Sequence, residues 1–367
     1  MLNILEKYPD ALIELRKDDH PLLGYFTNRV PVEILHTLGI IPIRMLTHGS
    51  KSQGASDRFI QTFGCEYLRT IMDIGLAEGF EVLDGIIFST GTCDSLQNVS
   101  DIWRKVFPNQ WAINLTFPVN VTGNLPLKFL TAEFQRFIET IGQHFKLDYA
   151  LTSQGDPDLT SSLKIYNKKR EILRELATLV SNRKLAYQVF AKYSLMGDII
   201  PVELFISFLQ EKLDDESYTA PVQMGSPRLL VAGGMGFDNY RLWQLPEFDH
   251  LVADDFSFGT RNFYFQIPPS ASFETYVKSY LDRVPDPTAY DLDRRESHLT
   301  DLIQKHKIDG VVLLGTKWCD PDAFEFVPLM NILKENGVPY VNIETSSDLE
   351  NLQQIKTRMR AFIEMLT

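Results

Sequence analysis

Three cysteines, Cys65, Cys93 and Cys319, are the residues of this 367-residue chain with the most distinctive potential chemistry. In a reducing compartment they do not form a disulfide framework. Each is therefore a small buried apolar residue, a nucleophile or a metal ligand. Three thiolates would supply three of the four ligands of an iron-sulfur cluster, so the spacing of these residues decides the interpretation.

Zinc is the other metal to consider. Tetrahedral structural zinc needs a fourth protein ligand, and none of the seven histidines lies in a pair with the spacing typical of zinc sites. A triad of cysteines leaves one iron open to a substrate oxygen or sulfur. Zinc is therefore the weaker of the two metal hypotheses, and a shared cluster and a two-domain binding or scaffold protein with merely buried cysteines both stay open.

An internal repeat places two of the cysteines at equivalent points. The first half contains DGIIFSTGTCD, residues 84–94, and the second half contains DGVVLLGTKWCD, residues 309–320. Each copy runs from Asp-Gly through an apolar strand and a loop to Cys-Asp, and a helix and a proline-marked strand follow. The copies differ by one residue, which we assign to the loop. The repeat predicts two similar domains that each present a cysteine beyond a strand.

All three cysteines stand just before predicted helices. Functional loops of open α/β sheets lie beyond the carboxyl ends of the strands, where Cys93 and Cys319 fall. The positive end of a helix lowers a thiol pKa and favours the thiolate that binds metal. Asp94 and Asp320 are then the expected N-cap residues. Cys65, in FGCEYLRTIMDIGLAEG, can present its sulfur in the same way.

Short apolar runs alternate with amphipathic stretches, which is typical of βαβ units and a mostly parallel sheet. The strand candidates are residues 39–46, 85–89 and 111–117 in the first half, and 228–232, 250–253, 311–315 and 340–344 in the second. We therefore predict an α/β fold of two similar doubly wound domains, of the Rossmann or flavodoxin type, with the cluster at their interface.

The middle of the chain has a different pattern. Residues 161–213 show helical spacing of apolar side chains without a strand, and the stretch DDESYTAPVQMGSPR that follows is rich in turn residues. We expect an N-terminal α/β domain over residues 1–160 with Cys65 and Cys93, a helical connector over 161–220, and a C-terminal α/β domain over 221–367 with Cys319.

Two motifs in the second half allow weaker hypotheses. GGMGF, residues 233–237, resembles a glycine-rich phosphate turn but lacks the G-x-G-x-x-G spacing, so we interpret it as a tight turn after a strand. In ADDFSFGTRNF, Arg261 can pair with Asp254 or Asp255 inside the protein. Alternatively, Arg261 and Asp255 can bind substrate, with the arginine meeting a phosphate or carboxylate.

A third motif lies in the helical stretch. Tyr166, Asn167 and Arg170 in IYNKKR share one helix and lie within reach of one another. We interpret them as a clamp between helices.

Charge and hydropathy limit the class of protein. The net charge of −12, from 36 basic and 48 acidic residues, argues against a nucleic-acid surface. The start MLNILEKYPDALIELRKDDHP carries charges where a signal peptide is apolar, and no segment has about 18 apolar residues in a row. We expect a cytoplasmic protein that binds neither nucleic acid nor membranes.

Several blocks together resemble the 2-hydroxyacyl-CoA dehydratase family, which also contains the subunits of ATP-dependent benzoyl-CoA reductase. They are GYFTNRVPVEILHTLGIIPIR, the segment around Cys65, TGTCDSLQNVSDIW, IYNKKREILREL, LVADDFSFGTRNF and IDGVVLLGTKWCDPDAFEFVPLMNILKENGVPYVNIETS. The resemblance covers nearly the whole chain and looks closest to the smaller dehydratase subunit. Its last block is the most specific.

The resemblance implies a heterodimer of two similar subunits, each holding a 4Fe-4S cluster on three cysteines at positions that match Cys65, Cys93 and Cys319. It further implies an ATP-hydrolysing iron-sulfur activator protein that injects one electron at low potential. That electron makes a ketyl radical of the acyl-CoA thioester, which permits loss of the 2-hydroxyl group. A reductase-type subunit uses the same electron chemistry and is not separated from a dehydratase by the sequence.

One departure from the family concerns the substrate. Family members commonly have F-C-[ST]-Y-x-P-E-E near the start, whereas residues 26–33 here are FTNRVPVE. Thr27, Asn28 and Glu33 are therefore the candidate catalytic residues. Because Asn28 stands at the hydroxyl position that can contact substrate, a subunit that relays electrons to a catalytic partner is a further interpretation.

Overall fold

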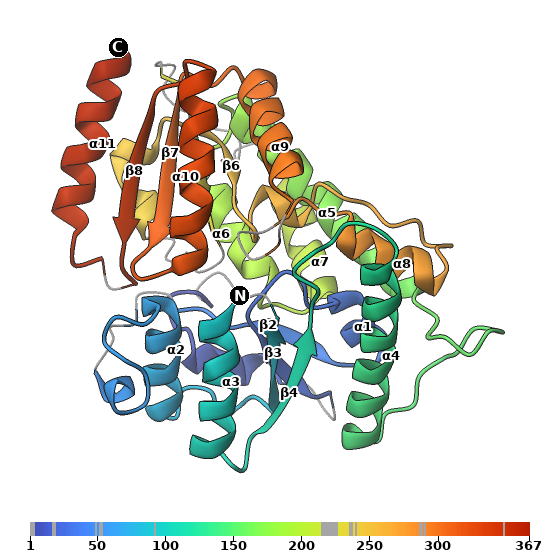
Figure 1. Ribbon diagram of the computed structural model, residues 1–367. Coiled ribbons are helices and arrows are strands. Elements are labelled where there is room, and N and C mark those ends of the chain that lie inside the picture. The colour runs from blue at the N-terminus through green and yellow to red at the C-terminus, as the bar shows by residue number, and fades with distance from the viewer. Residues whose placement is uncertain are drawn as a thin grey trace.

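The computed structural model describes residues 4–16, 20–47, 50, 54–91, 93–213, 227–234, 238, 241–285, 289, 291–347 and 349–367. These residues form two four-stranded parallel sheets, with strand orders β2-β1-β3-β4 and β6-β5-β7-β8. Figure 1 shows that the carboxyl ends of the two sheets face each other. The predicted α/β fold of two similar domains is confirmed.

The strands and helices follow one another in a regular order. The strands are β1 Leu22–Tyr25, β2 Ile41–Arg44, β3 Gly85–Thr90, β4 Trp111–Thr116, β5 Leu229–Gly233, β6 Leu251–Asp255, β7 Gly310–Thr316 and β8 Tyr340–Thr345. The α-helices are α1 Val32–Thr37, α2 Glu66–Leu76, α3 Asp94–Val106, α4 Leu125–Phe145, α5 Thr160–Ser181, α6 Tyr187–Gly197, α7 Val202–Leu213, α8 Phe273–Leu281, α9 Leu292–His306, α10 Asp320–Glu335 and α11 Leu352–Leu366. Short 3₁₀ helices are η1 Asp10–Leu15, η2 Ala55–Arg58, η4 Leu242–Gln244, η5 Pro246–Phe248 and η6 Thr260–Asn262.

These elements match every predicted strand and add one that the sequence pattern missed, the short β1. The helical stretch is confirmed as α5, α6 and α7. Residues 214–226 of the turn-rich stretch lie outside the described part of the chain, so the expected domain limits remain predictions. No helix among the described residues is long and apolar enough to cross a membrane.

Helices cover both faces of each sheet because alternate strand residues point to opposite sides. In the first domain, Ile86 and Phe88 of β3 pack in the same core as α2 and α3, whereas Ile87 packs with α1 and α4. In the second domain, Val311 of β7 packs with α9 and α10, and Val312 packs with α11. Both domains are thus doubly wound, as predicted.

The aspartate that opens each repeat fastens the first strand of its domain to the third. The Asp84 carboxylate accepts the N–H of Leu22 at 2.8 Å, and the Asp84 N–H donates to the Leu22 carbonyl at 2.9 Å. The Asp309 carboxylate likewise accepts the N–H of Arg228 at 2.7 Å, and its own N–H donates to the Arg228 carbonyl at 2.8 Å. The repeated Asp-Gly therefore has the same structural role in both domains.

The extra residue of the second repeat lies in the strand and not in the loop as predicted. β3 has six residues and β7 has seven, whereas each cysteine follows three residues after the strand's last residue. Both strands begin at the glycine of the repeat, because Gly310 pairs with Leu229 of β5 as Gly85 pairs with Leu23 of β1, and β7 ends one residue later than β3. The two cysteine loops are equal in length.

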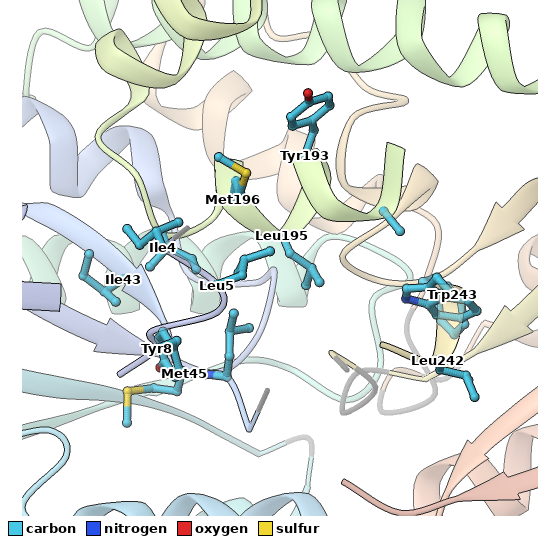
Figure 2. Close-up of a cluster of buried hydrophobic side chains, with 14 of the residues drawn as sticks. Ile4, Leu5, Tyr8, Ile43, Met45, Tyr193, Leu195, Met196, Leu242 and Trp243 are labelled. Carbon is cyan, nitrogen blue, oxygen red and sulfur yellow. Dashed lines mark hydrogen bonds between the residues drawn. The ribbon is translucent and has the colours of Figure 1, made fainter. Parts of the chain in front are cut away.

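A single apolar core joins the domains through the helical stretch. Figure 2 shows Leu195 and Met196 of α6 among side chains from the N-terminal segment, the β2 strand and η4. Tyr187 of α6 packs edge-on against Trp243 of η4, with ring centroids 5.3 Å apart. This core is what holds the two cysteine-bearing sheet edges opposite each other.

Candidate functional site

The three cysteines meet at one cavity between the domains. Each is the residue immediately before a helix: Cys65 before α2, Cys93 before α3 and Cys319 before α10. All three are partly buried. The cavity encloses about 460 Å³ including its open mouth, and it is lined by Phe26, Thr27, Cys65, Tyr67, Leu68, Cys93, Leu96, Cys319, Pro321 and Asp322.

Cys65 and Cys319 contact each other across the domains. A hydrogen bond from the Cys319 thiol lowers the pKa of Cys65, against the effect of burial, and the N–H groups of Leu68 and Tyr67 also lower it. The same hydrogen bond and burial raise the pKa of Cys319 well above its usual value. The contact between the two thiols thus lowers the pKa of Cys65 and raises that of Cys319.

The helix ends lower the thiol pKa values as expected, but burial outweighs them at Cys93, and the hydrogen bond with Cys65 together with burial outweighs them at Cys319. Burial raises the pKa of Cys93 to about 11, although the N–H groups of Leu96 and Ser95 lower it. The loss of hydration therefore outweighs the helix terminus. Metal binding at this cavity must displace protons from both thiols.

The prediction that Asp94 and Asp320 are N-cap residues is also wrong. Cys93 and Cys319 occupy the cap positions, without a side-chain capping hydrogen bond to the described backbone, and the aspartates are the first helical residues. Both aspartate side chains are exposed. They favour the helices through the charge of the first turn and do not cap the backbone.

The donor set fits a cluster better than a single metal ion. Among the described residues, no three His, Cys, Asp or Glu side chains are grouped closely enough to hold one ion. One ion needs its ligands within about 2.0 to 2.3 Å of a single point, whereas an iron-sulfur cluster binds each cysteine to a different iron. Three thiols around one apolar cavity, each with a helix N-terminus behind it, suit an anionic cluster.

The candidate catalytic residues separate in space. Thr27 lines the cysteine cavity, but its hydroxyl shares a 2.6 Å hydrogen bond with Ser89. Asn28 instead lines a different cavity of about 590 Å³, whose described lining contains no cysteine, and its side-chain amide donates to the Ser257 carbonyl at 2.8 Å.

Glu33 is fully buried away from the cysteine cavity. Its carboxylate pairs with Arg170 of α5 and accepts hydrogen bonds from Tyr276 at 3.0 Å and Tyr280 at 2.6 Å. The neighbouring Asn167 exchanges hydrogen bonds with the backbone of Ile267. The IYNKKR motif thus ties α5 to α1 and to a loop of the second domain.

Arg261 and Asp255 lie inside the second domain, paired with each other at 3.1 Å and completely buried. Asp255 also contacts Arg295 and His298. Although burial raises the pKa of Asp255, the Arg295 and Arg261 guanidinium groups outweigh it and hold the pKa far below its usual range. Of the two roles left open, this geometry supports internal pairing.

Two functional positions escaped the sequence reasoning. Glu66, next to Cys65, joins the domains at the cavity, since its carboxylate accepts the Ser347 N–H at 3.0 Å and its own N–H donates to the Lys317 carbonyl at 3.2 Å. Asp322 lines the cavity beside the cysteines. Its position one helical turn after Cys319 was the available signal.

Comparison with known proteins gives one consistent result. The family model described as 2-hydroxyglutaryl-CoA dehydratase, D-component, matches residues 27–366. The chain is similar to a subunit of the benzoyl-CoA reductase of Thauera aromatica, 22% identical, with 94% of this chain and 90% of that protein covered. It is similar to the (R)-phenyllactyl-CoA dehydratase beta subunit of Clostridium sporogenes, 22% identical, with 94% and 91% covered. It is also similar to the beta subunit of (R)-2-hydroxyglutaryl-CoA dehydratase of Acidaminococcus fermentans, 22% identical, with 94% and 92% covered.

Proposed function

The chain belongs to the 2-hydroxyglutaryl-CoA dehydratase D-component family, and from this premise we propose that it is the iron-sulfur subunit of a 2-hydroxyacyl-CoA dehydratase. The reaction is the radical dehydration of an (R)-2-hydroxyacyl-CoA to the 2-enoyl-CoA. The observation that carries the proposal is the convergence of Cys65, Cys93 and Cys319 on one cavity from both domains. A homologous larger subunit and an ATP-dependent iron-sulfur activator are the expected partners.

The residues around the cavity have distinct tasks in this proposal. The three thiolates hold a 4Fe-4S cluster, which when bound supplies a single electron at low potential. Phe26, Leu68 and Leu96 surround the thiols with apolar surface and limit the access of water. The backbone N–H groups of Leu68 and Leu96 face the sulfurs of Cys65 and Cys93 and favour negative charge there.

The candidate substrate residues support a relaying role for this subunit. Asn28 lines another cavity, and Glu33 is paired with Arg170 and hydrogen-bonded to two tyrosines. Of the three candidates, only Thr27 lines the cysteine cavity. The reacting thioester is then held by the partner subunit. This chain passes the electron to it.

Apolar side chains beside the cysteines support a partner surface there. Trp318, immediately before Cys319, is 51% exposed, and Phe63, two residues before Cys65, is 67% exposed. Exposed aromatic residues are enriched where proteins bind one another. We expect the larger subunit or the activator to cover this mouth.

Anaerobic reconstitution with iron and sulfide tests the proposal directly. The purified chain should bind about four irons with broad absorption near 400 nm, and Cys93→Ser should lose both. Asp94→Asn, an exposed change at the next residue, is the matched control and should keep them. A fully folded wild-type chain that takes up no iron would overturn the proposal.

A reductase-type role is the alternative, because a benzoyl-CoA reductase subunit is among the relatives. Turnover separates the two once the partner subunit and activator are present. Formation of an enoyl thioester from a 2-hydroxyacyl-CoA supports the dehydratase, and reduction of an aromatic thioester supports the reductase.

A further inference from the structure

The cavity that Asn28 lines is separate from the cysteines and joins three parts of the chain. It encloses about 590 Å³ including its open mouth. Its described lining comes from the end of β1 and the segment that follows, from the helical stretch α5 to α7, and from the segment around η6 in the second domain. Cavities of about 300 to 1,000 Å³ are typical of sites for small molecules.

Two tyrosine hydroxyls in this cavity have no hydrogen-bond partner among the described residues. Tyr25 is 3% exposed and Tyr166 is 5% exposed, yet neither hydroxyl oxygen is completely enclosed by protein atoms. Burial raises the pKa of both tyrosines well above the usual value, so both hydroxyls stay protonated and can donate. Buried hydroxyls without a partner are rare, and these two need an acceptor from whatever occupies the cavity.

Lys169 and Asn262 add two further donors to the lining. The Lys169 ammonium donates to the Gly197 carbonyl and, at 3.1 Å, to the Asp198 carboxylate, so one of its three N–H groups has no acceptor among the described residues. The half-buried Asn262 side chain makes no hydrogen bond within the described part of the chain. Two hydroxyls, an ammonium group and an amide can therefore all donate to an occupant.

The described lining carries more positive than negative charge. It contains Lys169, Arg170 and Arg283 but a single carboxylate, that of Asp198. Glu33 pairs with Arg170 from outside the lining, which reduces this excess without reversing it. Much of the remaining lining is apolar, with Val30, Leu173, Ile200, Val202, Phe258 and Phe263. Donors and positive charge suit an oxyanion, and the apolar surface suits a hydrocarbon chain attached to it.

We propose that this cavity binds a small organic acid, whose carboxylate accepts hydrogen bonds from Tyr25, Tyr166 and Lys169 and whose hydrocarbon chain lies against the apolar lining. Asn262 supplies a further donor. The site goes beyond the proposed function, because it needs neither a cluster nor the reacting thioester. Residues 25–28 border both this cavity and the cysteine cavity, so the two sites share one segment of the first domain.

Isothermal titration calorimetry of the metal-free, full-length wild type tests the proposal. The probes are sodium acetate, butyrate and hexanoate at constant ionic strength, with butyramide as the uncharged counterpart of butyrate. We expect saturable binding of the carboxylates, tighter for the longer chains because more apolar surface is buried, and no binding of butyramide. Equal binding of butyrate and butyramide would overturn the proposal. Absence of saturable carboxylate binding would mean that water alone fills the cavity, which would also overturn it.

Variants then locate the carboxylate. Tyr25→Phe and Tyr166→Phe should each weaken butyrate binding about tenfold to a hundredfold, as expected for one lost hydrogen bond to a charged group. Tyr340→Phe, in β8 and outside the described lining, is the matched control and should bind as the wild type does. Thermal unfolding without ligand should show no loss of stability, because the removed hydroxyls have no partner among the described residues. Unchanged butyrate affinity in both cavity variants, or destabilisation of both ligand-free variants, contradicts the proposed site.

Discussion

The two domains share one strand order and one aspartate clamp, yet they place opposite charges at the end of the equivalent strand. β2 ends at Arg44, which is buried against the Phe258 ring and lies 3.5 Å from Asp198 of the helical stretch. β6 ends at Asp255, which is buried among Arg261, Arg295 and His298 of its own domain. Arg44 therefore connects the first domain to parts of the chain outside it, whereas Asp255 stabilises the second domain from within.

The helix before the third strand differs in a second way. In the second domain α9 starts after Asp291, whose carboxylate accepts the Arg294 N–H and caps the helix. In the first domain α2 starts after Cys65, whose side chain makes no capping hydrogen bond within the described part of the chain. The same structural position therefore carries an ordinary cap in one domain and a thiol in the other, as expected if the thiol has a task other than helix stability.

The largest effect should come from replacing Cys65 by serine. Serine is a better helix cap than cysteine, so we expect the metal-free protein to fold with unchanged or higher stability. The loss of one of three thiolate ligands should nevertheless abolish most iron binding. Iron analysis and thermal unfolding of the same sample check the expected loss of iron and the expected stability. Full iron retention by Cys65→Ser would show that the cysteine is only a poor helix cap.

The next largest effect should come from breaking the charge network at the end of β6. Asp255→Asn leaves Arg261 and Arg295 without the carboxylate that both contact, so we expect a loss of about 3–5 kcal/mol in the free energy of unfolding. Denaturant titration measures it. Asp101→Asn, which breaks an exposed pair with Arg104, is the control and should cost at most about 0.5 kcal/mol. Equal losses in the two variants would contradict the assigned role of the network.

Asp254, next to Asp255, should make the second domain sensitive to pH. Burial raises the pKa of Asp254 to about 6, against the hydrogen bonds from Thr260 and Phe256. The folded protein therefore holds this proton more tightly than the unfolded chain. The resulting stabilisation is complete below about pH 4 and is lost as the pH rises through about 6.

Asp254→Asn should remove this dependence, since an amide can keep the bonds to Thr260 and Phe256. Relative to wild type, we expect the variant to gain about 3 kcal/mol between pH 4 and pH 7.5. Unfolding titrations of both proteins across that range provide the measurement. If the difference in free energy of unfolding between the variant and the wild type stays constant with pH, the raised pKa of Asp254 is disproved.

The smallest effect belongs to the helix cap of the second domain. Asp291→Ala removes the hydrogen bond to the Arg294 N–H and should cost about 1 kcal/mol. Iron content should not change, because Asp291 is not part of the lining of the cysteine cavity. Loss of iron in Asp291→Ala would contradict the separate roles of the helix cap at Asp291 and the thiol at Cys65.

Periodicity and the repeat predicted the fold class and seven of the eight described strands because those strands are apolar runs bounded by turn residues. β1 was missed because Gly24 interrupts its short apolar run. That glycine leaves room for the Met45 side chain, which would have to shift for a larger residue, since a Cβ there would lie 2.6 Å from the Met45 sulfur. Such a contact between strands and loops is not visible in a one-dimensional pattern.

The sequence predicted the features of the site that depend on position along the chain, but not those that depend on the residues packed around it. The repeat placed Cys93 and Cys319 at equivalent strand ends, but burial, which sets the pKa of Cys93, follows from the packing of α2 and α3. Asp322 depends on the space above Gly234, from a distant strand. Residues fixed by two distant segments are the ones that the sequence pattern did not reveal.

The link between Glu66 and the second domain has a consequence for how the protein matures. Neither domain alone carries all three cysteines, and the hydrogen bonds of Glu66 to Ser347 and Lys317 set Cys65 against the second domain. We therefore expect assembly of the proposed cluster to follow domain docking. A nascent chain of which only the first domain has been synthesised carries two thiols, too few to retain a cluster firmly until Cys319 has emerged.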